Sequence, residues 1–581
     1  MQQDKFTNKP KELEMIISDS VKTSDALTDV MEQFNIKKVV ETFNNIKRNG
    51  ILVSKILTIM LIMPFFKVAS IRAMFKSGIG TKEIEGKKDV YYDIKNNEKV
   101  NWRSLLLLIA IRFNYLIKQR EELNTKGVKA IIFDDTPVEK TSKKTENVSL
   151  LHDHVTGRFI LGYKLLVCGY WDGGSFIPLD FSLHREKGQM FDKALHSLKK
   201  VETALQQAQE NLDHSKNRYA VKTQKYNERL KIATDCSGKT NQYYLNCAEK
   251  AKLKAKAELK EAQKEVTNKT NQVSVQRENV KETERKHPSY GLNKKAKKEQ
   301  FKKKRTKGSY GYERCEETDT DKIENSLSML RRVIKVGFMP DYVLTDSWFF
   351  CFKLLNMLTN LAKGQIKLIS MAKMDSRKYS LPKNGKEYNS KALLTIHKRS
   401  AKNCRKLKSQ YIKIPCLYQG IRVNLFFVRM GRNDNWKLLI TNDINLNFTR
   451  LIEIYHIRWS IEVFFKEGKQ FLNIGHSLSQ DFDAQIADTT LSMIQHIMLS
   501  YYKRINYQQS FGFLFKEISS QMIEKSLTER MWILFLELQL LIGDIAGFDV
   551  LELYQELFKR KETSELIERI LLPNYNLKKV A

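Results

Sequence analysis

The stretch Lys129-Ala-Ile-Ile-Phe-Asp134 marks the point at which the chain changes from helical to strand-like sequence. It is a short apolar run that ends in a carboxylate, and Tyr342-Val-Leu-Thr-Asp346 has the same form much later in the chain. Short apolar runs of this kind are typical of buried strands. An acid at the end of such a strand is held rigidly yet lies near solvent, which suits a hard cation such as Mg²⁺. An ordinary strand-to-loop aspartate is the alternative at either position taken alone.

Helical and strand-rich blocks surround these two runs. Helical sequence occupies residues 12–125, and strand-like sequence occupies 159–183, where a hairpin or meander is expected. Strand-like sequence resumes at 342–346 and at 366–370 and continues through 411–441, before helices that run from about 448 onward. Blocks of strands followed by blocks of helices predict an α/β or α+β fold with insertions.

A long polar stretch, residues 192–286, interrupts the strand-rich part. It is rich in Ala, Lys, Glu and Gln, contains no proline and has one break, at Cys236-Ser-Gly238. Two helices of roughly 45 residues each, doubling back at the glycine, fit this composition. The apolar seam is weak, so a solvated helical arm stands beside an antiparallel coiled coil as the simpler description.

The charge of the chain indicates a polyanionic partner. One hundred Lys and Arg face 66 Asp and Glu, which gives a formal net charge of +34 and a pI near 9.6. Such an excess repels itself in a compact protein unless an anionic partner neutralises it. Nucleic acid is the commonest such partner, because each cation on a phosphate releases condensed counterions. A membrane surface and simple solubility are the alternatives.

The densest basic run follows the polar stretch. Residues 294–307 carry nine basic side chains and one glutamate, which makes this run the strongest local candidate for contact with a polyanion. The side chains that we expect to contact DNA are Lys302, Lys303, Lys304 and Arg305.

Cysteine usage and hydropathy indicate a cytoplasmic protein without a membrane partner. The seven cysteines are scattered and form no C-x-x-C, so neither disulfides nor a zinc ribbon is predicted. The polar start of the chain lacks a signal-peptide core. Residues 51–66 are apolar but interrupted by Lys55 and Pro64, and 105–111 is too short to cross a bilayer. Both segments are predicted to be buried helices.

Four polar residues, Tyr455, Arg458, Glu462 and Lys469, are spaced so that they share one face of a predicted helix. At about 100° per residue they fall within a stripe about 60° wide, apart from the apolar sector that would face the core. Arginine forks onto phosphate, lysine adds a point charge and tyrosine donates a hydrogen bond. The stripe therefore suits a phosphodiester held beside a metal-binding acid, with a solvated helix face as the alternative.

The same four residues carry a resemblance to a known family. Tyr455-x2-Arg458-x3-Glu462-x6-Lys469 resembles the Y-R-E-K signature of the insertion-sequence-four family of DDE transposases. The four-residue signature is highly specific.

The two strand-end acids extend this resemblance. Asp134-x-Thr136 resembles the first acidic motif of the family, and Asp346 after its strand resembles the second. The order of the acids agrees, and so does the β-rich region before Glu462, where several members carry a β-rich insertion. The resemblance covers about residues 129–190 and 340–473.

The resemblance implies an RNase H-like core in which Asp134, Asp346 and Glu462 bind two Mg²⁺ ions, with Mn²⁺ as a substitute. Two such ions would activate the attacking water or 3′-hydroxyl and stabilise the leaving oxygen. Tyr455, Arg458 and Lys469 would bind the transposon-end DNA. The implied activity is cut-and-paste transposition, in which a homodimer on paired terminal inverted repeats joins 3′-OH ends to target DNA. The implied location is the bacterial cytoplasm, in association with the nucleoid.

Several alternatives remain open at this level. Asp135 adjoins Asp134 and could replace it as the first metal ligand, although the acid-x-Thr pattern favours Asp134. Trp436 is a candidate for stacking on a flipped base, as a Trp near the β insertion does in some relatives, or for a buried core position. A shift of one residue on a strand would turn it to the opposite face. The chain could also be a nuclease of this fold that no longer transposes, or a non-catalytic basic DNA-binding protein.

The predicted organisation has seven segments, with the catalytic core divided by two insertions. They are a helical DNA-binding region at 1–125, core at 126–191, the helical arm and basic loop at 192–315, core at 316–374, a β-rich insertion at 375–445, the catalytic helix at 446–480 and a helical C-terminal region at 481–581.

Overall fold

The computed structural model forms two compact units, Met1–Arg185 with Glu299–Ala581 and, separately, Glu186–Lys298. The larger unit has a mixed α/β fold, and the smaller one is helical, which confirms the expected fold class. The residues that the structure describes are 26–68, 70–77, 84–153, 156–186, 189–236, 242–286, 298–382, 385–431, 435–506, 510–550, 552–553, 556, 560 and 562.

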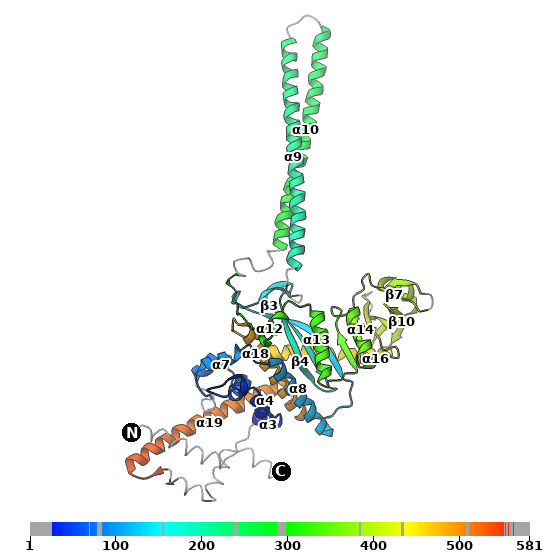
Figure 1. The fold of residues 1–581 in the computed structure, drawn as a ribbon. Coiled ribbons are helices and arrows are strands. Elements are labelled where there is room, and N and C mark those ends of the chain that lie inside the picture. Colours follow the sequence, from blue (N-terminus) through cyan, green and yellow to red (C-terminus); the bar gives the residue numbers. More distant parts are fainter. Residues whose placement is uncertain are drawn as a thin grey trace. The chain divides into compact units, whose positions relative to one another are not determined.

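The centre of the larger unit is a mixed sheet (Figure 1). Strand β3 pairs antiparallel with β1 along one edge. Along its other edge it pairs antiparallel with β2 through its first residues and with β4 through the rest. β5 pairs parallel to β1, and β6 pairs parallel to β5. The expected hairpin at 159–183 is therefore the β3–β4 pair. The bounds are β1 Ala130–Glu139, β2 Ser149–Asp153, β3 Arg158–Trp171, β4 Phe176–His184, β5 Tyr342–Thr345 and β6 Lys367–Ala372.

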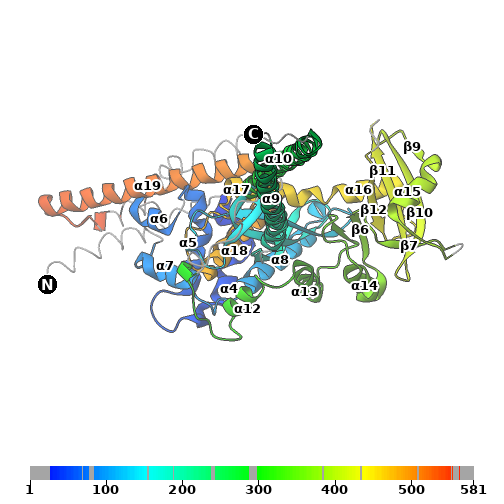
Figure 2. The same ribbon diagram turned by 90° about the horizontal axis from the view of Figure 1, so that it is seen from above.

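The β-rich insertion extends this same sheet. β12 pairs antiparallel with β6, and β11 and β10 follow in order, so the insertion is hydrogen-bonded to the core sheet (Figure 2). Short strands β7 and β9 both pair with β10, and β8 pairs with β7. The bounds are β7 Lys378–Ser380, β8 Glu387–Asn389, α15 Ser390–His397, η5 Lys398–Ser400, β9 Lys402–Cys404, β10 Ser409–Tyr418, β11 Ile421–Met430 and β12 Lys437–Thr441.

Four helices, α8, α13, α17 and α18, contact β4. Helix α18 is the most enclosed of them, with almost every side chain from Phe482 to Tyr501 buried. It also contacts α3, α5, α7 and α8, so the C-terminal part of the chain completes the core that the N-terminal helices begin. The bounds are α8 Trp102–Gln119, α12 Tyr310–Glu316, α13 Lys322–Lys335, α14 Phe352–Asn360, η4 Leu361–Gly364, α16 Phe448–His456, α17 Trp459–Phe471, α18 Phe482–Ile505 and α19 Phe511–Ala546.

The N-terminal helices are short, and the apolar run at 51–66 is buried as expected. No single helix among the described residues is long and apolar enough to cross a membrane. The bent pair Val53–Phe66 and Ile71–Ser77, taken together, has the length and composition of a membrane span and no other feature of one. Eight of the ten residues of α5 are buried in the protein itself. The bounds are α3 Ala26–Gln33, α4 Ile36–Glu41, η1 Asn44–Ile46, α5 Val53–Ile62, η2 Met63–Phe66, α6 Ile71–Ser77, α7 Lys88–Lys95 and η3 Glu121–Leu123.

The smaller unit consists of α9 Gln189–Cys236 and α10 Gln242–Lys286, which lie side by side (Figure 1). Lys222 pairs with Glu258 and Arg218 with Glu265, so the pairing runs antiparallel. Few apolar side chains of this unit are buried, which agrees with the weak seam of the sequence. The predicted turn at Gly238 lies outside the described residues.

Candidate active site

Two of the candidate acids lie on neighbouring parallel strands, Asp134 within β1 and Asp346 directly after β5. The expectation that the first strand ends at Asp134 is wrong, because β1 continues its pairing with β3 to Glu139. Phe133 of β1 is in register with Thr345 of β5, so Asp134 and Asp346 come directly after paired residues, at the same level of the sheet. Asp346 accepts hydrogen bonds from the backbone N–H groups of Trp348, at 2.9 Å, and Phe349, at 3.3 Å. These bonds fix the second carboxylate where β5 ends.

Arg458 connects the third acid to the first. Its Nη1 donates to Asp134 Oδ2 at 2.8 Å, and its Nη2 donates to Glu462 Oε1 at 2.5 Å. The guanidinium therefore lies between two candidate metal ligands that are far apart in the chain. Its side chain is 16% exposed, so this bridge is largely shielded from water.

The helix that carries these groups is divided, whereas the sequence predicted one continuous helix. α16 ends at His456 and α17 begins at Trp459, with a tight turn between them. Arg458 N–H donates to Tyr455 O, a three-residue hydrogen bond in place of the usual four-residue one. Arg458 keeps helical backbone angles, so its side chain still reaches Glu462 as an i,i+4 pair.

The two ends of the predicted stripe bind the sheet. Tyr455 Oη donates to the carbonyl of Thr345, the last residue of β5, at 3.3 Å. Lys469 Nζ donates to Thr136 Oγ1 at 2.7 Å and to Pro137 O at 2.9 Å, both in β1. The structure therefore places all four stripe residues against the strands that carry the two aspartates.

The electrostatics of the site show carboxylates held close together. Burial, reinforced by Asp346 and Asp135 and opposed by Arg458, raises the pKa of Asp134 to about 7. Burial also raises the pKa of Tyr455 to about 12. Burial alone would lower the pKa of Arg458, but its anionic neighbours, with Tyr455, raise it, so it remains a cation.

These donors fit a divalent cation in their chemistry. Carboxylate oxygens are the ligands that Mg²⁺ prefers, and two of the candidate carboxylates share a single cationic partner, Arg458. Within the described part of the chain, no three His, Cys, Asp or Glu side chains are grouped so as to hold a metal ion. Arg458 lies where Asp134 and Glu462 would otherwise share a cation.

Asp135 has a different environment from Asp134. Its Oδ2 accepts from Lys322 Nζ at 2.6 Å, and successive strand residues face opposite sides of a sheet. The geometry favours Asp134 over Asp135 as the acid that joins the site. Lys322 also lies 5.0 Å from the ring of Trp348, which is exposed beside Asp346. The sequence around Lys322 gives no indication that this lysine pairs with Asp135, because 187 residues separate the two in the chain.

The basic run at residues 302–305 alternates between the protein interior and solvent. Lys303 binds Asp481 and Asp483, and Arg305 binds Glu146 and Asp483. The Arg305 side chain is only 3% exposed, whereas Lys302 and Lys304 are exposed. This alternation is that of an extended segment lying on a surface. It leaves Lys302 and Lys304 available to a polyanion and engages the other two cations in internal ion pairs.

Trp436 lies in the core of the insertion. It is 4% exposed, immediately before β12, and the guanidinium of Arg429 lies 5.1 Å from its ring centre. Stacking on a base would require this indole to be uncovered first. Of the two alternatives that the sequence left open, the structure places it in the buried position.

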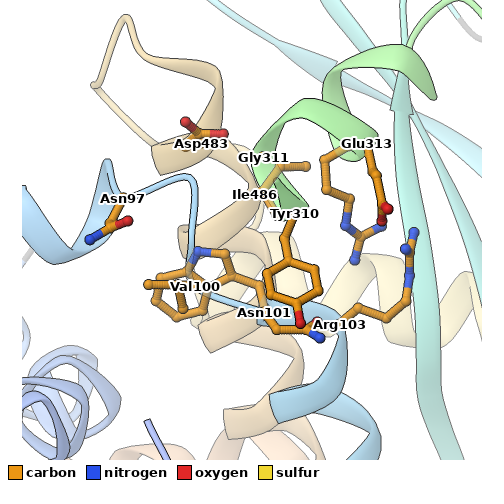
Figure 3. Close-up of a pocket in the computed structure, with 11 residues that line it drawn as sticks. Asn97, Val100, Asn101, Arg103, Tyr310, Gly311, Glu313, Asp483 and Ile486 are labelled. Atoms are coloured by element: carbon orange, nitrogen blue, oxygen red, sulfur yellow. The ribbon is translucent and has the colours of Figure 1, made fainter. Parts of the chain in front are cut away.

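A small pocket elsewhere in the larger unit contains none of the candidate catalytic residues (Figure 3). It offers about 10 Å³, close to the space that one water needs. It is therefore too small for a substrate. Its lining residues are Asn97, Val100, Asn101, Trp102, Arg103, Tyr310, Gly311, Glu313, Arg314, Asp483 and Ile486.

Comparison with known families gives one result. The family model described as a transposase DDE domain matches residues 309–497. The matched region contains Asp346 and the whole stripe from Tyr455 to Lys469, whereas Asp134 precedes it. The match supports a DDE transposase, a class that generally uses divalent metals and binds DNA, and it implies an RNase H-like core. No curated protein matches the chain.

Proposed function

We propose that this chain is a DDE transposase of the insertion-sequence-four family that excises a DNA segment and joins its 3′-OH ends to target DNA. The observation that carries the proposal is the bridge that Arg458 makes between Asp134 and Glu462, beside the strand that leads to Asp346. Asp134 and Asp346 come from paired parallel strands, and Arg458 holds Glu462 beside Asp134. The match to a transposase DDE domain supports the same chemistry.

In this proposal the three carboxylates hold two Mg²⁺ ions, or Mn²⁺ in their place. When bound, such ions activate the attacking oxygen and stabilise the leaving oxygen of an in-line displacement. Asp134 lies within β1, Asp346 directly follows β5, and Glu462 lies in the first turn of α17, so each ligand lies in a regular element or directly at its end.

Arg458 and its neighbours would orient the DNA. A guanidinium that bridges two carboxylates can instead fork onto a phosphate. We expect Arg458 to exchange its carboxylate partners for the phosphate next to the scissile bond when DNA binds. Tyr455 attaches α16 to β5, and Lys469 attaches α17 to β1. In the proposal, Tyr455 would donate a hydrogen bond to the DNA backbone and Lys469 would add a positive charge beside it.

DNA outside the site would lie along exposed basic surface. Lys302 and Lys304 point to solvent and would contact the phosphates of the terminal repeats, while Lys303 and Arg305 hold their segment to the protein. The proposed substrate is a pair of terminal inverted repeats held by a homodimer. The organisation in seven segments, with helices at 1–125 as the DNA-recognition region, remains part of this proposal.

The decisive experiment compares Glu462→Gln with Glu453→Gln, an exposed acid on the preceding helix. Purified protein is mixed with Mg²⁺ or Mn²⁺ and the inverted repeats that flank its own gene. Glu462→Gln should abolish cleavage while leaving end binding intact, and Glu453→Gln should cleave as the wild type does. Persistent cleavage by Glu462→Gln would overturn the assignment, and cleavage without joining by the wild type would indicate a nuclease that no longer transposes.

A further inference from the structure

The β-rich insertion carries positive charge with no acid to balance it. The 46 residues between Glu387 and Asp434 include eleven lysines and arginines and no aspartate or glutamate. The whole chain has about two acids for every three basic residues, 66 against 100, so this imbalance is not the average composition. A surface of one sign favours a partner of the opposite sign.

The basic residues are densest at the turn that joins β9 to β10. This segment, Arg405-Lys-Leu-Lys408, is the basic turn, and Arg405, Lys406 and Lys408 are all exposed. Lys402 on β9 is exposed as well. Edge strands often carry lysine because it prevents pairing with other chains. That role would account for Lys402 but not for three cations in one turn.

Contacts with α16 hold the basic turn in place. Lys406 Nζ donates to Glu453 Oε1 at 2.7 Å, and Cys404 Sγ lies 3.9 Å from Thr449 Oγ1. Glu453 lies two residues before Tyr455, whose hydroxyl binds the last residue of β5. Helix α16 therefore connects the basic turn to the end of the strand that leads to the second candidate acid.

Arg405 and Lys408 are the cations of the turn that remain available. Among the described residues neither has an ion-pair partner, whereas Lys406 pairs with Glu453. Arginine forks onto phosphate, and lysine adds a point charge to it. The insertion itself contains no carboxylate that could compete with phosphate for these side chains.

The sheet places the basic turn and Asp346 at the same end. β6 runs parallel to β5, and β12, β11 and β10 then alternate in direction, so β10 begins at the end of the sheet where β5 finishes. Ser409, the first residue of β10, lies beyond the level of Thr345 toward that end. Four strand spacings separate β5 from β10, which gives about 20 Å across the sheet. The paired residues that define this level are Thr345, Ser370, Ile440, Leu425 and Ile414.

We infer that the basic turn binds the phosphate backbone of the same duplex whose scissile phosphate lies at the candidate acids, about six to eight base pairs from that phosphate. The length follows from the distance across the sheet, the projection of the turn beyond Thr345, and a rise of about 3.4 Å per base pair. Phosphate contacts position a duplex without reading its bases, so this contact should be independent of sequence. The inference rests on the proposed function, because that function places the scissile phosphate at the acids.

The first experiment measures binding to duplexes of different lengths in EDTA, so that no cleavage occurs. One series extends each side of the cleavage point of the terminal repeat from about two to about twelve base pairs, which brackets the estimated contact. The variant Arg405→Gln with Lys408→Gln should bind short duplexes as the wild type does. Once the duplex on one side passes about six base pairs, it should bind roughly tenfold more weakly than the wild type.

The control removes two cations from the other end of the same strands. Lys378→Gln with Arg422→Gln changes exposed residues at that end and should bind every duplex as the wild type does. Circular dichroism should be the same in all three proteins. A turn variant that binds long duplexes as tightly as the wild type would overturn the inference. A loss of affinity that is equal for short and long duplexes would overturn it as well.

The second experiment separates this inference from the assignment of the catalytic acids. For a duplex without the terminal repeat, Arg405→Gln with Lys408→Gln should reduce the slope of log affinity against log salt by about two. A reduced slope, together with continued cleavage by Glu462→Gln, would refute the proposed chemistry and retain the basic turn as a DNA contact. An unchanged slope, together with an inactive Glu462→Gln, would refute the role of the basic turn alone.

Discussion

Arg458 Nη1 lies 2.8 Å from Asp134 Oδ2, although 324 residues separate the two in the chain. The same guanidinium binds Glu462. One cation of the protein therefore pairs with two carboxylates that the proposed chemistry assigns to metal ions. Arg458 keeps these acids together and would compete with the ions for them.

Removing this cation should strengthen metal binding. Arg458→Gln leaves Asp134 and Glu462 without a competing positive charge, and at close range such a charge contributes strongly to ion affinity. We expect Mn²⁺ to bind roughly tenfold more tightly in the absence of DNA, measured by calorimetry. Arg450→Gln, which removes an exposed arginine from the preceding helix, is the control and should bind Mn²⁺ as the wild type does. Equal affinity in all three proteins would contradict a competing role for Arg458.

Asp134 should destabilise the metal-free protein at alkaline pH. Its pKa is raised to about 7, against an ordinary value near 4, so the folded state binds its proton more tightly than the unfolded state. Stability should therefore rise as the pH falls from about 7 toward 4, other groups being equal. Asp134→Asn should melt at a higher temperature than the wild type at pH 8, and the difference should vanish near pH 4. A variant that is less stable than the wild type at pH 8 would contradict this prediction.

Asp134 and Asp135 should differ sharply in their effect on cleavage. Asp134→Asn removes a proposed metal ligand and should abolish cleavage of the terminal repeats. Asp135→Asn breaks the pair with Lys322 and reaches the site only indirectly, so a loss of about ten- to a hundredfold at most is expected. Gel assays of both variants in Mg²⁺ measure the difference. The opposite ranking would make Asp135 the metal ligand.

Lys302 and Lys304 should contact DNA phosphates. Both side chains are exposed on a segment whose neighbours Lys303 and Arg305 face inward. Each substitution by alanine should weaken binding to any duplex and reduce the slope of log affinity against log salt by about one. Affinity for duplex DNA measured at several salt concentrations between about 50 and 200 mM, over which it should fall by about a decade or more, gives this slope. Unchanged slopes would place the DNA elsewhere.

Arg305 should matter for folding rather than for DNA contact. Arg305→Met removes the guanidinium that binds Glu146 and Asp483, both almost fully buried. Uncompensated buried carboxylates of this kind cost about 3–5 kcal/mol. Denaturant unfolding should reveal a loss of this size, and the salt slope for DNA should remain as in the wild type. A stable variant with a reduced slope would reverse the two roles.

The sequence by itself predicted the fold class and the elements that carry the candidate site. Apolar runs ending in acid identified β5 and the first half of β1, because local hydrophobic patterning determines which segments are buried strands. The continuation of β1 to Glu139 depends on its pairing with β3 and was not predicted. The spacing of Tyr455, Arg458, Glu462 and Lys469 identified the helical face, since a helix brings residues three, four and seven apart to one side.

Tertiary structure alone decided which partners these residues have. Arg458 meets Asp134, and Lys322 meets Asp135, across hundreds of residues, and no local pattern encodes such contacts. Burial also depends on packing: Arg305 is buried although its neighbour Lys304 is exposed, and Trp436 is enclosed in the insertion. The sequence therefore determined which side chains are present on each element. The packing of distant elements determined which charged side chains pair within the protein and which stay exposed.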